Sequence, residues 1–402
     1  MASKNSAWIP RSFAPRSFIA KMEKKLIDRY ISGDIIKKLS SGSKIVAVFG
    51  ARQVGKTTLV EQIIGVLRAR IFRANADEIK YRDVFESQNL DTMKSLVSGY
   101  DLLFIDEAQR IENIGINLKI LHEGIKNLKI IVTGSSSFEL ANKIKEPLTG
   151  RMWTYTLFPL SFLELSKTKN TFALRQLLDS VLVYGEYPGV FTLESNEEKR
   201  KLLKELTVSY LYKDILQLES IKYANKIAKL LKLLAFQIGN EVSLNELAGS
   251  LEMSRATVER YIDLLEKSFV LFRLSSFSGN KRKDVVKKDK IYFYDTGIRN
   301  ALIENFEALP ERNDVGGLFE NFLIAERVKR NAYEETGAHG YFWRTYGGGE
   351  VDYIEESSSG ISAYEFKYKK NSSRRPRSFL AEYPEAKFTL INRENYLPFV
   401  LQ

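Results

Sequence analysis

Short apolar runs alternate with segments of helical spacing along the first third of the chain. Apolar, β-branched residues predict buried strands at Lys44–Phe49, Leu102–Ile105 and Lys129–Thr133. From Thr57 to Leu67 the apolar residues recur at helical spacing instead. Strands that alternate with helices in this way predict a three-layer α/β domain.

The middle of the chain predicts helices that end in a helix-turn-helix. Helical spacing dominates from about Glu197 to Ile238. Ser243 then begins a capping box that opens a helix to about Leu251, and Ser254 caps a second helix after a short turn. The second helix should bury one stripe and expose the opposite face, which carries Arg255, Thr257, Glu259 and Arg260.

Two strand-like segments follow this helix pair and predict a winged helix. Phe269–Phe277 and Ile291–Tyr294 flank a loop at Gly279–Lys290, and Lys281–Lys290 within it holds six cations. Such a loop is suited to contact with a phosphate backbone. Packing within the protein and a solvated loop are the alternatives. Base-specific readout is not expected, because the exposed helix face is short and mixed in sign.

The last hundred residues combine an amphipathic helix, Leu318–Tyr333, with three further strand-like segments. These are Gly340–Thr345, Glu350–Glu355 and Ile361–Tyr368. The loop Ser357–Gly360 predicts a hairpin between the last two, which sets Asp352 opposite Glu365 and Glu350 opposite Lys367. Side chains alternate along a strand, so all four share one face.

The composition excludes several kinds of chemistry. The 402 residues include no Cys and two His, which rules out disulfides, thiolate zinc sites and cysteine nucleophiles. No apolar run approaches the ~18 residues of a spanning helix, and the N-terminus has no secretory pattern. We therefore expect no membrane partner and a location in the reducing cytoplasm.

The net charge of +11 is concentrated in three short segments: Met1–Lys25, Lys281–Lys290 and Phe366–Arg377. The remainder of the chain is slightly acidic. This distribution predicts local contacts with a polyanion such as DNA, with solvated loops and a solvated tail as the alternative.

A phosphate-binding loop follows the first predicted strand. The run Gly50-Ala51-Arg52-Gln53-Val54-Gly55-Lys56-Thr57 fits G-x-x-x-x-G-K-[ST] at every fixed position, and Thr58 follows it. In this motif backbone N–H groups surround the phosphates, Lys56 reaches the β- and γ-phosphates, and Thr57 ligates Mg²⁺. The cofactors expected here are ATP and Mg²⁺.

Acidic and hydroxyl side chains follow the next two strands. Asp106 and Glu107 follow the second strand, where Asp106 is placed to hold Mg²⁺ and Glu107 to orient or deprotonate the attacking water. A pair of acids at a helix N-terminus is the alternative. Ser135 follows the third strand, at the edge of a parallel sheet where ligands bind.

These residues resemble an AAA-type P-loop ATPase over about residues 40–165. The resemblance implies that Ser135 senses the γ-phosphate and that Arg151, in Leu148-Thr149-Gly150-Arg151, is an arginine finger. In many such proteins the finger acts on the ATP of a neighbouring subunit, which would imply a homo-oligomer. An intramolecular salt bridge is the alternative for Arg151.

Two further segments, Phe158–Leu165 and Tyr184–Gly189, resemble one prokaryotic branch of these ATPases, in which the ATPase is fused to a C-terminal domain of unknown function. The resemblance then covers nearly the whole chain, apart from about the first twenty residues. For Tyr184–Gly189 the residues predict only a turn between helices.

The C-terminal acids suggest a second metal site. Two carboxylates opposite each other in a ladder repel, and a divalent cation with oxygen ligands, Mg²⁺ or Mn²⁺, would remove the conflict. With Glu320 on the preceding helix, the set Glu320, Asp352, Glu365 and Lys367 resembles the PD-(D/E)xK nuclease fold. The alternative is a nuclease-like fold used only for binding, with Lys367 paired to Glu350.

The expected organisation is therefore α/β throughout, in five parts: a basic extension (1–25), an AAA-type P-loop domain (26–165), a helical lid (166–225), a winged helix (226–300) and a restriction-endonuclease-like domain (301–402). The expected function is ATP binding and hydrolysis, with a nucleic-acid-binding or nuclease-like C-terminal half. The alternative is a nucleotide-gated switch or interaction protein whose nuclease-like domain is inactive.

Overall fold

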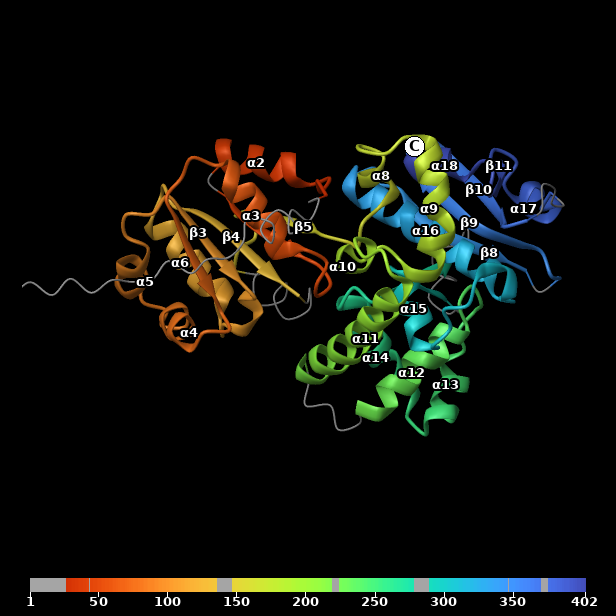
Figure 1. Ribbon diagram of the computed structural model, residues 1–402, viewed down its shortest axis with the longest axis horizontal. Helices are drawn as coiled ribbons and strands as arrows, with labels where there is room; N and C mark the ends of the chain where they lie inside the picture. Colours follow the sequence, from red (N-terminus) through yellow and green to blue (C-terminus); the bar gives the residue numbers. More distant parts are fainter. Residues whose placement is uncertain are drawn as a thin grey trace, which may run out of the picture.

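The computed structural model describes residues 27–42, 44–135, 147–218, 224–277, 289–345, 347–369 and 375–402. The predicted basic extension, Ser136, Ser137 and the wing residues 278–288 lie outside this part of the chain. Figure 1 shows a lobe that holds β1–β5 and α2–α6 beside a larger lobe that holds the remaining elements. Among the described residues, no helix has both the length and the apolar character needed to span a membrane.

The smaller lobe is built on a parallel sheet of five strands in the order β2-β3-β4-β1-β5. The strands are β1 (Ile45–Phe49), β2 (Ile71–Asn75), β3 (Leu102–Asp106), β4 (Lys129–Gly134) and β5 (Met152–Thr156). The three strands predicted from apolar runs are confirmed. The edge strands β2 and β5 escaped prediction because their residues are mostly only partly buried, so their apolar pattern is weak.

Helices cover both faces of this sheet, which confirms the three layers. Val46 and Val48 pack with α2 (Ser32–Ser41) and α3 (Lys56–Val66). Ile45, Ala47 and Phe49 point the other way, into the core formed with α4 (Ile79–Phe85), α5 (Leu90–Val97) and α6 (Ile114–Gly124). Because alternate residues of β1 are buried on opposite faces, the strand reads as a continuous apolar run.

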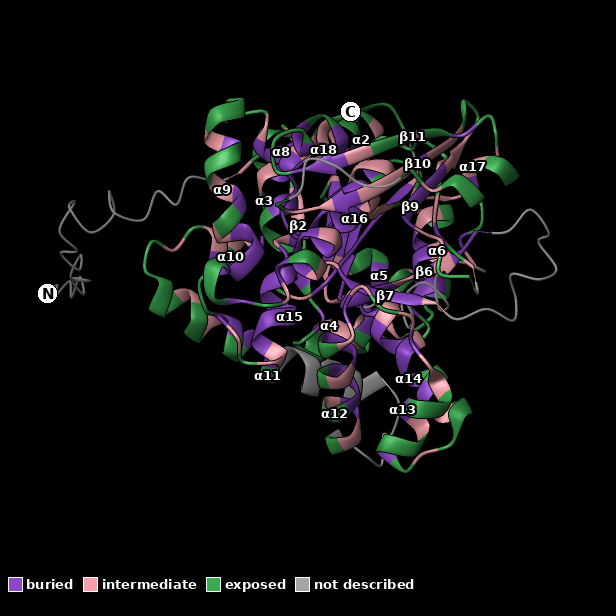
Figure 2. Cartoon of the chain, turned by 90° about the vertical axis from the view of Figure 1, so that its right-hand side faces the viewer, coloured by how far each residue is buried: buried purple, intermediate pink, exposed green. Residues whose placement is uncertain are grey.

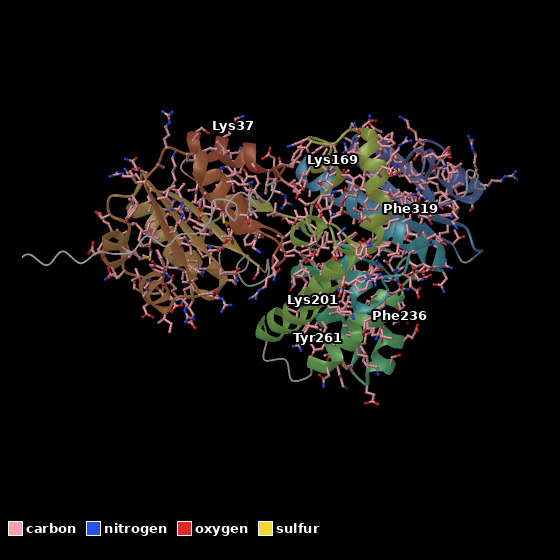
Figure 3. All side chains as sticks on the ribbon, viewed as in Figure 1. Lys37, Lys169, Lys201, Phe236, Tyr261 and Phe319 are labelled. Carbon is pink, nitrogen blue, oxygen red and sulfur yellow. The ribbon has the colours of Figure 1, made fainter. Side chains whose placement is uncertain are left out.

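The larger lobe begins with helices. These are α8 (Phe162–Leu165), α9 (Thr171–Tyr184), α10 (Pro188–Phe191), α11 (Asn196–Leu218), α12 (Ala224–Phe236), α13 (Leu244–Leu251), α14 (Arg255–Lys267) and α15 (Thr296–Leu302). The predicted helix pair α13 and α14 is confirmed, with Ser243 and Ser254 as N-caps. The stripe predicted to be buried on α14 is buried, and Figure 3 labels Tyr261 within it.

A mixed sheet of six strands, in the order β11-β10-β9-β8-β6-β7, completes the larger lobe. The strands are β6 (Leu271–Ser276), β7 (Lys290–Phe293), β8 (His339–Arg344), β9 (Glu350–Ser357), β10 (Gly360–Lys367) and β11 (Lys387–Asn392). The β6–β7 pair of the predicted winged helix therefore belongs to the same sheet as the C-terminal strands. The expected boundary after residue 300 falls within α15 and separates β6 and β7 from the four later strands of the same sheet.

Helix α16 (Val315–Tyr333) covers one face of the six-stranded sheet, and α17 (Arg377–Glu382) packs on the other, while α18 (Tyr396–Leu401) lies against α16. Phe319 of α16 contacts the rings of Tyr368 and Tyr396 in the interior of the lobe. One hydrophobic core continues from the α2/α3 face of the smaller lobe through α8, α9 and α16. Figure 2 shows the buried residues that follow α16 through this core.

Candidate functional site

The P-loop connects the end of β1 to the start of α3. Gly50 adopts a φ of 152°, and a Cβ at this position would overlap the carbonyl oxygen of Leu157. Gly55 is the left-handed N-cap of α3, whose first residue is Lys56. The motif requires a strand, then a glycine-rich loop, then the N-terminus of a helix, and the chain has them in this order. The first turn of a helix has unpaired N–H groups, and in α3 these adjoin the loop.

The Lys56 side chain is turned onto its own loop. It is 5% exposed, and its Nζ donates to the carbonyl oxygens of Gly50 at 2.9 Å and Ala51 at 2.8 Å. Both acceptors are neutral backbone groups, which an anionic ligand outcompetes for an ammonium group.

Thr57 and Asp106 meet at the same edge of the sheet. The Thr57 hydroxyl donates to Oδ2 of Asp106 at 2.9 Å, and the Thr133 hydroxyl donates to Oδ1 of the same carboxylate. Thr133 lies on β4, next to β3, and its role escaped sequence reasoning. A hydroxyl and a carboxylate in contact provide the oxygen ligands that Mg²⁺ prefers, so the expected pair fits a nucleotide-bound Mg²⁺.

Glu107 and Ser135 are joined by a residue that the sequence did not single out. The Gln109 amide nitrogen donates to Oε2 of Glu107 at 2.5 Å and to Oγ of Ser135 at 3.0 Å. Glu107 has a φ of 54°, in the region that non-glycine residues rarely adopt, as strained residues at functional sites often do. The Oε1 atom of Gln109 is buried without a hydrogen-bond partner in the described structure.

Arg151 lies at the other edge of the sheet. It precedes β5, which pairs with β1 in parallel register from Ile45↔Met152 to Phe49↔Thr156. At about 3.3 Å per residue, a strand length of roughly 16 Å separates it from the P-loop that follows β1. Its guanidinium pairs with Glu123 of α6 at 2.9 Å, and both side chains are about half exposed.

A cavity of about 240 Å³ opens beside the P-loop. Pro188, Gly189 and Thr192 of the larger lobe line it, together with residues of the loop, of α3 and of the segment before α2. The Tyr184–Gly189 segment, expected only to turn, thus contributes a wall of this cavity. Its Gly185 is required because a Cβ there would overlap the Asp295 carboxylate.

The predicted hairpin register is confirmed next to the carboxylate cluster, our name for Glu320, Glu350, Asp352 and Glu365. The register runs from Gly360↔Ser357 to Tyr364↔Tyr353, so Asp352 and Glu365 follow as the next facing pair. The Lys367 Nζ lies 2.7 Å from Glu365 Oε1 and 3.9 Å from Asp352 Oδ2. The pairing of Lys367 with Glu350, an alternative at the sequence level, is wrong.

Glu350 pairs with Lys290, a residue that we expected to lie on the exposed wing. The Lys290 Nζ lies 2.8 Å from Glu350 Oε1 and 3.4 Å from Glu320 Oε1, and this lysine is 1% exposed. The Tyr292 hydroxyl donates to Glu320 Oε1 at 2.5 Å. Lys290 and Tyr292 lie on one face of β7, which the shared sheet brings to the cluster. The basic residues Lys281, Arg282, Lys283, Lys287 and Lys288 lie outside the described part.

Burial shifts the pKa values of several side chains in the carboxylate cluster and of Lys290 beside it. Burial, together with the charges of Glu320 and Glu365, raises the pKa of Asp352 to about 8. Burial also raises the pKa of Glu320, although Lys290 and Tyr292 oppose this effect. For Lys290 burial would lower the pKa, but Glu320 and Glu350 outweigh it, so the pKa is raised and the lysine stays charged.

The cluster does not form the expected metal-binding group. In the part of the chain that the structure describes, no three His, Cys, Asp or Glu side chains are arranged to hold a metal ion. Glu320, Asp352 and Glu365 are gathered as predicted, but Lys290 and Lys367 provide cationic partners among them. These residues as placed therefore do not fit a second Mg²⁺ or Mn²⁺.

Three family models match successive parts of the chain. Residues 42–166 match an AAA domain, residues 175–309 a domain of unknown function (DUF8612), and residues 315–399 another domain of unknown function (DUF4143). The chain thus has a segment similar to AAA domains, followed by two segments similar to domains of unknown function. This confirms the broad resemblance, while the winged helix and the nuclease-like fold remain predictions.

The chain is also similar to two uncharacterized proteins and to one solved structure. An uncharacterized protein of Mycobacterium tuberculosis is 28% identical over 383 residues, which are 92% of this chain and 81% of the relative. One from Methanocaldococcus jannaschii is 25% identical over 349 residues, 81% of this chain and 75% of the relative. A Walker-type ATPase of Pyrococcus abyssi is similar in structure with a TM-score of 0.48 and 13% identity, over 70% of this chain and 97% of that one.

Proposed function

We propose that the smaller lobe binds ATP with Mg²⁺ and hydrolyses it. The observation that carries the proposal is that Lys56, Thr57, Asp106, Glu107 and Ser135 come together where β1, β3 and β4 end. Ligands of open α/β sheets bind at this edge.

Each side chain has a distinct part in the proposed reaction. The loop N–H groups and the N-terminus of α3 accept the phosphates, and Lys56 leaves the carbonyls of Gly50 and Ala51 to pair with phosphate oxygens. Thr57 and Asp106 would hold Mg²⁺, which neutralises phosphate charge when bound. Glu107 orients the attacking water and accepts its proton.

The cavity beside the P-loop gives the nucleotide an orientation. The phosphates lie at the N-terminus of α3, so the adenosine end extends toward the cavity that Pro188 and Gly189 help to line. The nucleotide would then touch both the P-loop domain and the following helical region. This placement gives the Tyr184–Gly189 segment a role that the sequence did not.

Phosphate release and nucleotide affinity test the proposal together. We expect Lys56→Ala to weaken ATP binding and to abolish hydrolysis, and Glu107→Gln to bind ATP but hydrolyse it at least 100-fold more slowly. Lys126→Ala, at an exposed lysine of the same lobe, is the matched control and should behave as wild type. Equal phosphate release by wild type and Lys56→Ala would end the assignment.

Arg151 supports a further proposal, action on the ATP of a neighbouring copy. The residue is exposed and about a strand length from the P-loop of its own chain. Mixing two inactive variants tests action between copies, because Arg151→Ala retains an intact P-loop and Lys56→Ala retains its arginine. Partial recovery of hydrolysis in the mixture is expected, and a mixture as inactive as its components would argue against this role.

For the C-terminal half we propose a nucleotide-gated switch that faces nucleic acid, rather than a metal-dependent nuclease. The favouring observation is that Lys290 and Lys367 already balance the carboxylates that a nuclease would offer to a metal. Pairing of oppositely charged groups in a buried site makes either partner costly to remove.

A cleavage assay separates the two readings of this half. DNA is incubated with Mg²⁺ or Mn²⁺ and wild type, Glu365→Gln or Asp352→Asn, and binding is measured in parallel with and without ATP. DNA binding that responds to ATP, without nicking, supports the switch. Metal-dependent nicking that Glu365→Gln abolishes would establish the nuclease instead.

A further inference from the structure

One arginine of the segment before α2 connects the P-loop to the larger lobe. Arg29 is 5% exposed, and its guanidinium uses all three nitrogens. Nη1 donates to the carbonyl oxygen of Val54 at 2.8 Å, Nη2 to that of Phe158 at 2.5 Å, and Nε to Oε1 of Glu164 at 2.9 Å. A planar fork with five donors can serve such divergent acceptors together, whereas a lysine cannot.

The contact with Val54 fixes the P-loop itself. Val54 directly precedes Gly55, the N-cap of α3, and a Cβ on Gly55 would lie 3.6 Å from Arg29 Nη1. Arg29 holds this loop by a carbonyl oxygen, so the backbone N–H groups stay available to phosphates. The loop is also packed at its start, where Gly50 lies against the carbonyl of Leu157.

Phe158, the residue after Leu157, contacts the end of α16. The Phe158 N–H donates to the hydroxyl of Tyr333 at 3.2 Å, and Arg29 Nη2 donates to the same hydroxyl at 3.5 Å. The Tyr333 ring stacks on Tyr30 with 5.5 Å between ring centroids. The last residue of α16 therefore contacts the same arginine that holds the P-loop.

A second group of buried contacts, around Lys329, joins α16 to residues 160–162 and to Glu186. The Lys329 Nζ donates to Glu186 Oε2 at 2.7 Å, to Glu326 Oε1 at 2.8 Å and to the carbonyl of Leu160 at 3.0 Å. The N–H of Phe162 donates to Oε2 of Glu326 at 2.5 Å. All three charged side chains are buried, although Oε1 of Glu186 has no hydrogen-bond partner in the described structure. Separation of Lys329 from its carboxylates would be costly, which favours joint movement of the helix end and residues 158–162.

The other end of α16 carries Glu320 of the carboxylate cluster. Thirteen residues separate Glu320 from Tyr333, which corresponds to about 20 Å along a helix that rises 1.5 Å per residue. One continuous helix thus spans the distance between the Arg29 junction and the cluster.

Nucleotide binding would change the contacts of the loop that Arg29 holds. Lys56 now donates to the carbonyls of Gly50 and Ala51, and phosphates would draw its ammonium away from both. A ligand shifts a conformation only through contacts that differ between two states, and the position of Lys56 provides such a difference. Gly50, one of these two acceptors, packs against Leu157, and Arg29 bonds the carbonyl of Val54 in the same loop.

We propose that Arg29 positions the P-loop for the nucleotide and that, through Tyr333, it couples occupancy of the P-loop to helix α16. The inference rests on the proposed function only in that the P-loop takes ATP. Arg29 and Tyr333 are positioning residues, since neither touches the phosphates.

Hydrogen–deuterium exchange on the full chain tests the coupling, with ADP and a non-hydrolysable ATP analogue as probes. In wild type we expect nucleotide to slow exchange in the last two turns of α16, residues 326–333, at least threefold. Lys56→Ala should show no change. Tyr333→Phe should bind nucleotide within threefold of wild type but lose the response, while Tyr383→Phe, which removes a hydroxyl that contacts Glu382, should keep it.

Arg29→Lys tests the positioning role. It keeps the charge but cannot reach all three acceptors, so the nucleotide dissociation constant should rise about tenfold, with less effect on the rate at saturation. Suppose that wild type binds nucleotide in a Lys56-dependent way but that exchange in α16 does not change. This result would overturn the coupling without contradicting the proposed function. A response that survives Tyr333→Phe would also overturn it, whether or not Arg29→Lys folds. Absence of nucleotide binding would instead count against the proposed function.

Discussion

The nucleotide site and the carboxylate cluster both place lysines at the edge of a sheet, but these lysines have different partners. Lys56 donates to neutral backbone carbonyls, whereas Lys290 and Lys367 pair with carboxylates. A charged ligand replaces a neutral acceptor easily, but separation of a buried ion pair leaves two charges uncompensated. The first site would thus admit an anion, whereas the carboxylates of the second already have cations of the same chain beside them.

The largest effect on stability is expected from Lys290→Met, which breaks the internal balance of the cluster. Glu320 and Glu350 would lose their cation, and their side chains are 15% and 36% exposed. Removal of one partner of a buried pair costs about 3 kcal/mol or more, and the exposure of Glu350 reduces the expected loss to about 2–3 kcal/mol. Urea unfolding at pH 8 measures the loss, which should shrink at pH 5 because burial raises the pKa of Glu320 and favours its protonated form.

Arg73→Met is the control for this variant, because it removes an ion pair with Glu61 whose partners are about half exposed. Such exposed pairs contribute about 0–1 kcal/mol. A Lys290→Met loss as small as that of Arg73→Met would mean that water reaches the cluster, and the contrast between the two sites would disappear.

The next effect concerns the pH dependence of stability at Asp352. Its pKa is about 8 in the folded chain, against about 3.9 in an unfolded one. Between these values the folded chain holds a proton that the unfolded chain has lost, so stability falls as the pH rises from about 4 to 8. Asp352→Asn removes this charge, and we expect it to be at least about 1.4 kcal/mol more stable than wild type at pH 8.5.

The same substitution should have little effect at pH 4, where wild-type Asp352 is protonated when folded. Asp101→Asn is the control of opposite sign, because hydrogen bonds from Arg70 lower the pKa of this exposed carboxyl to about 2. Loss of the Asp101 charge in Asp101→Asn should reduce the free energy of unfolding at pH 8.5. Chemical unfolding at both pH values gives the comparison. A loss of stability in Asp352→Asn at pH 8.5 would mean that the Asp352 charge is stabilised by its partners and not penalised by burial and by Glu320 and Glu365.

The two sites also differ in how much the sequence reveals of them. The P-loop lies in one continuous segment, where glycine positions and a following helix define the backbone, so its geometry follows from local order. The register Asp352/Glu365 was equally local and was predicted. Lys290 was assigned to the wrong surface because β6 and β7 join a sheet whose other strands lie fifty to a hundred residues later.

Long-range packing likewise hid Arg29 and Gln109. Arg29 has partners at Val54, Phe158, Glu164 and Tyr333, and no spacing rule connects these positions. Gln109 follows Glu107 by two residues, which offered a signal, but only the fold brings Ser135 within 3.0 Å. Residues that connect elements are therefore harder to predict than residues within a motif.

A smaller effect is expected at Gln109, which sharpens the description of the nucleotide site. Gln109→Leu conserves volume but removes the donor that holds Glu107 and Ser135 together. We expect the single-turnover rate of ATP hydrolysis to fall about tenfold, or about 1.4 kcal/mol, with unchanged ATP affinity. A faster rate would show that Gln109 restrains Glu107 instead of aligning it.

The smallest effect is expected at the exposed pair of Arg151 and Glu123, which resembles neither site. Both side chains are about half exposed, so Glu123→Gln should change the free energy of unfolding by less than about 1 kcal/mol. If Arg151 acts on a neighbouring copy, its ion pair with Glu123 is not needed for hydrolysis. Glu123→Gln should then hydrolyse ATP at the wild-type rate, and Arg151→Ala should not. Measured at one protein concentration, an equal loss of activity in both variants would mean that the ion pair itself, and not the free arginine, supports hydrolysis.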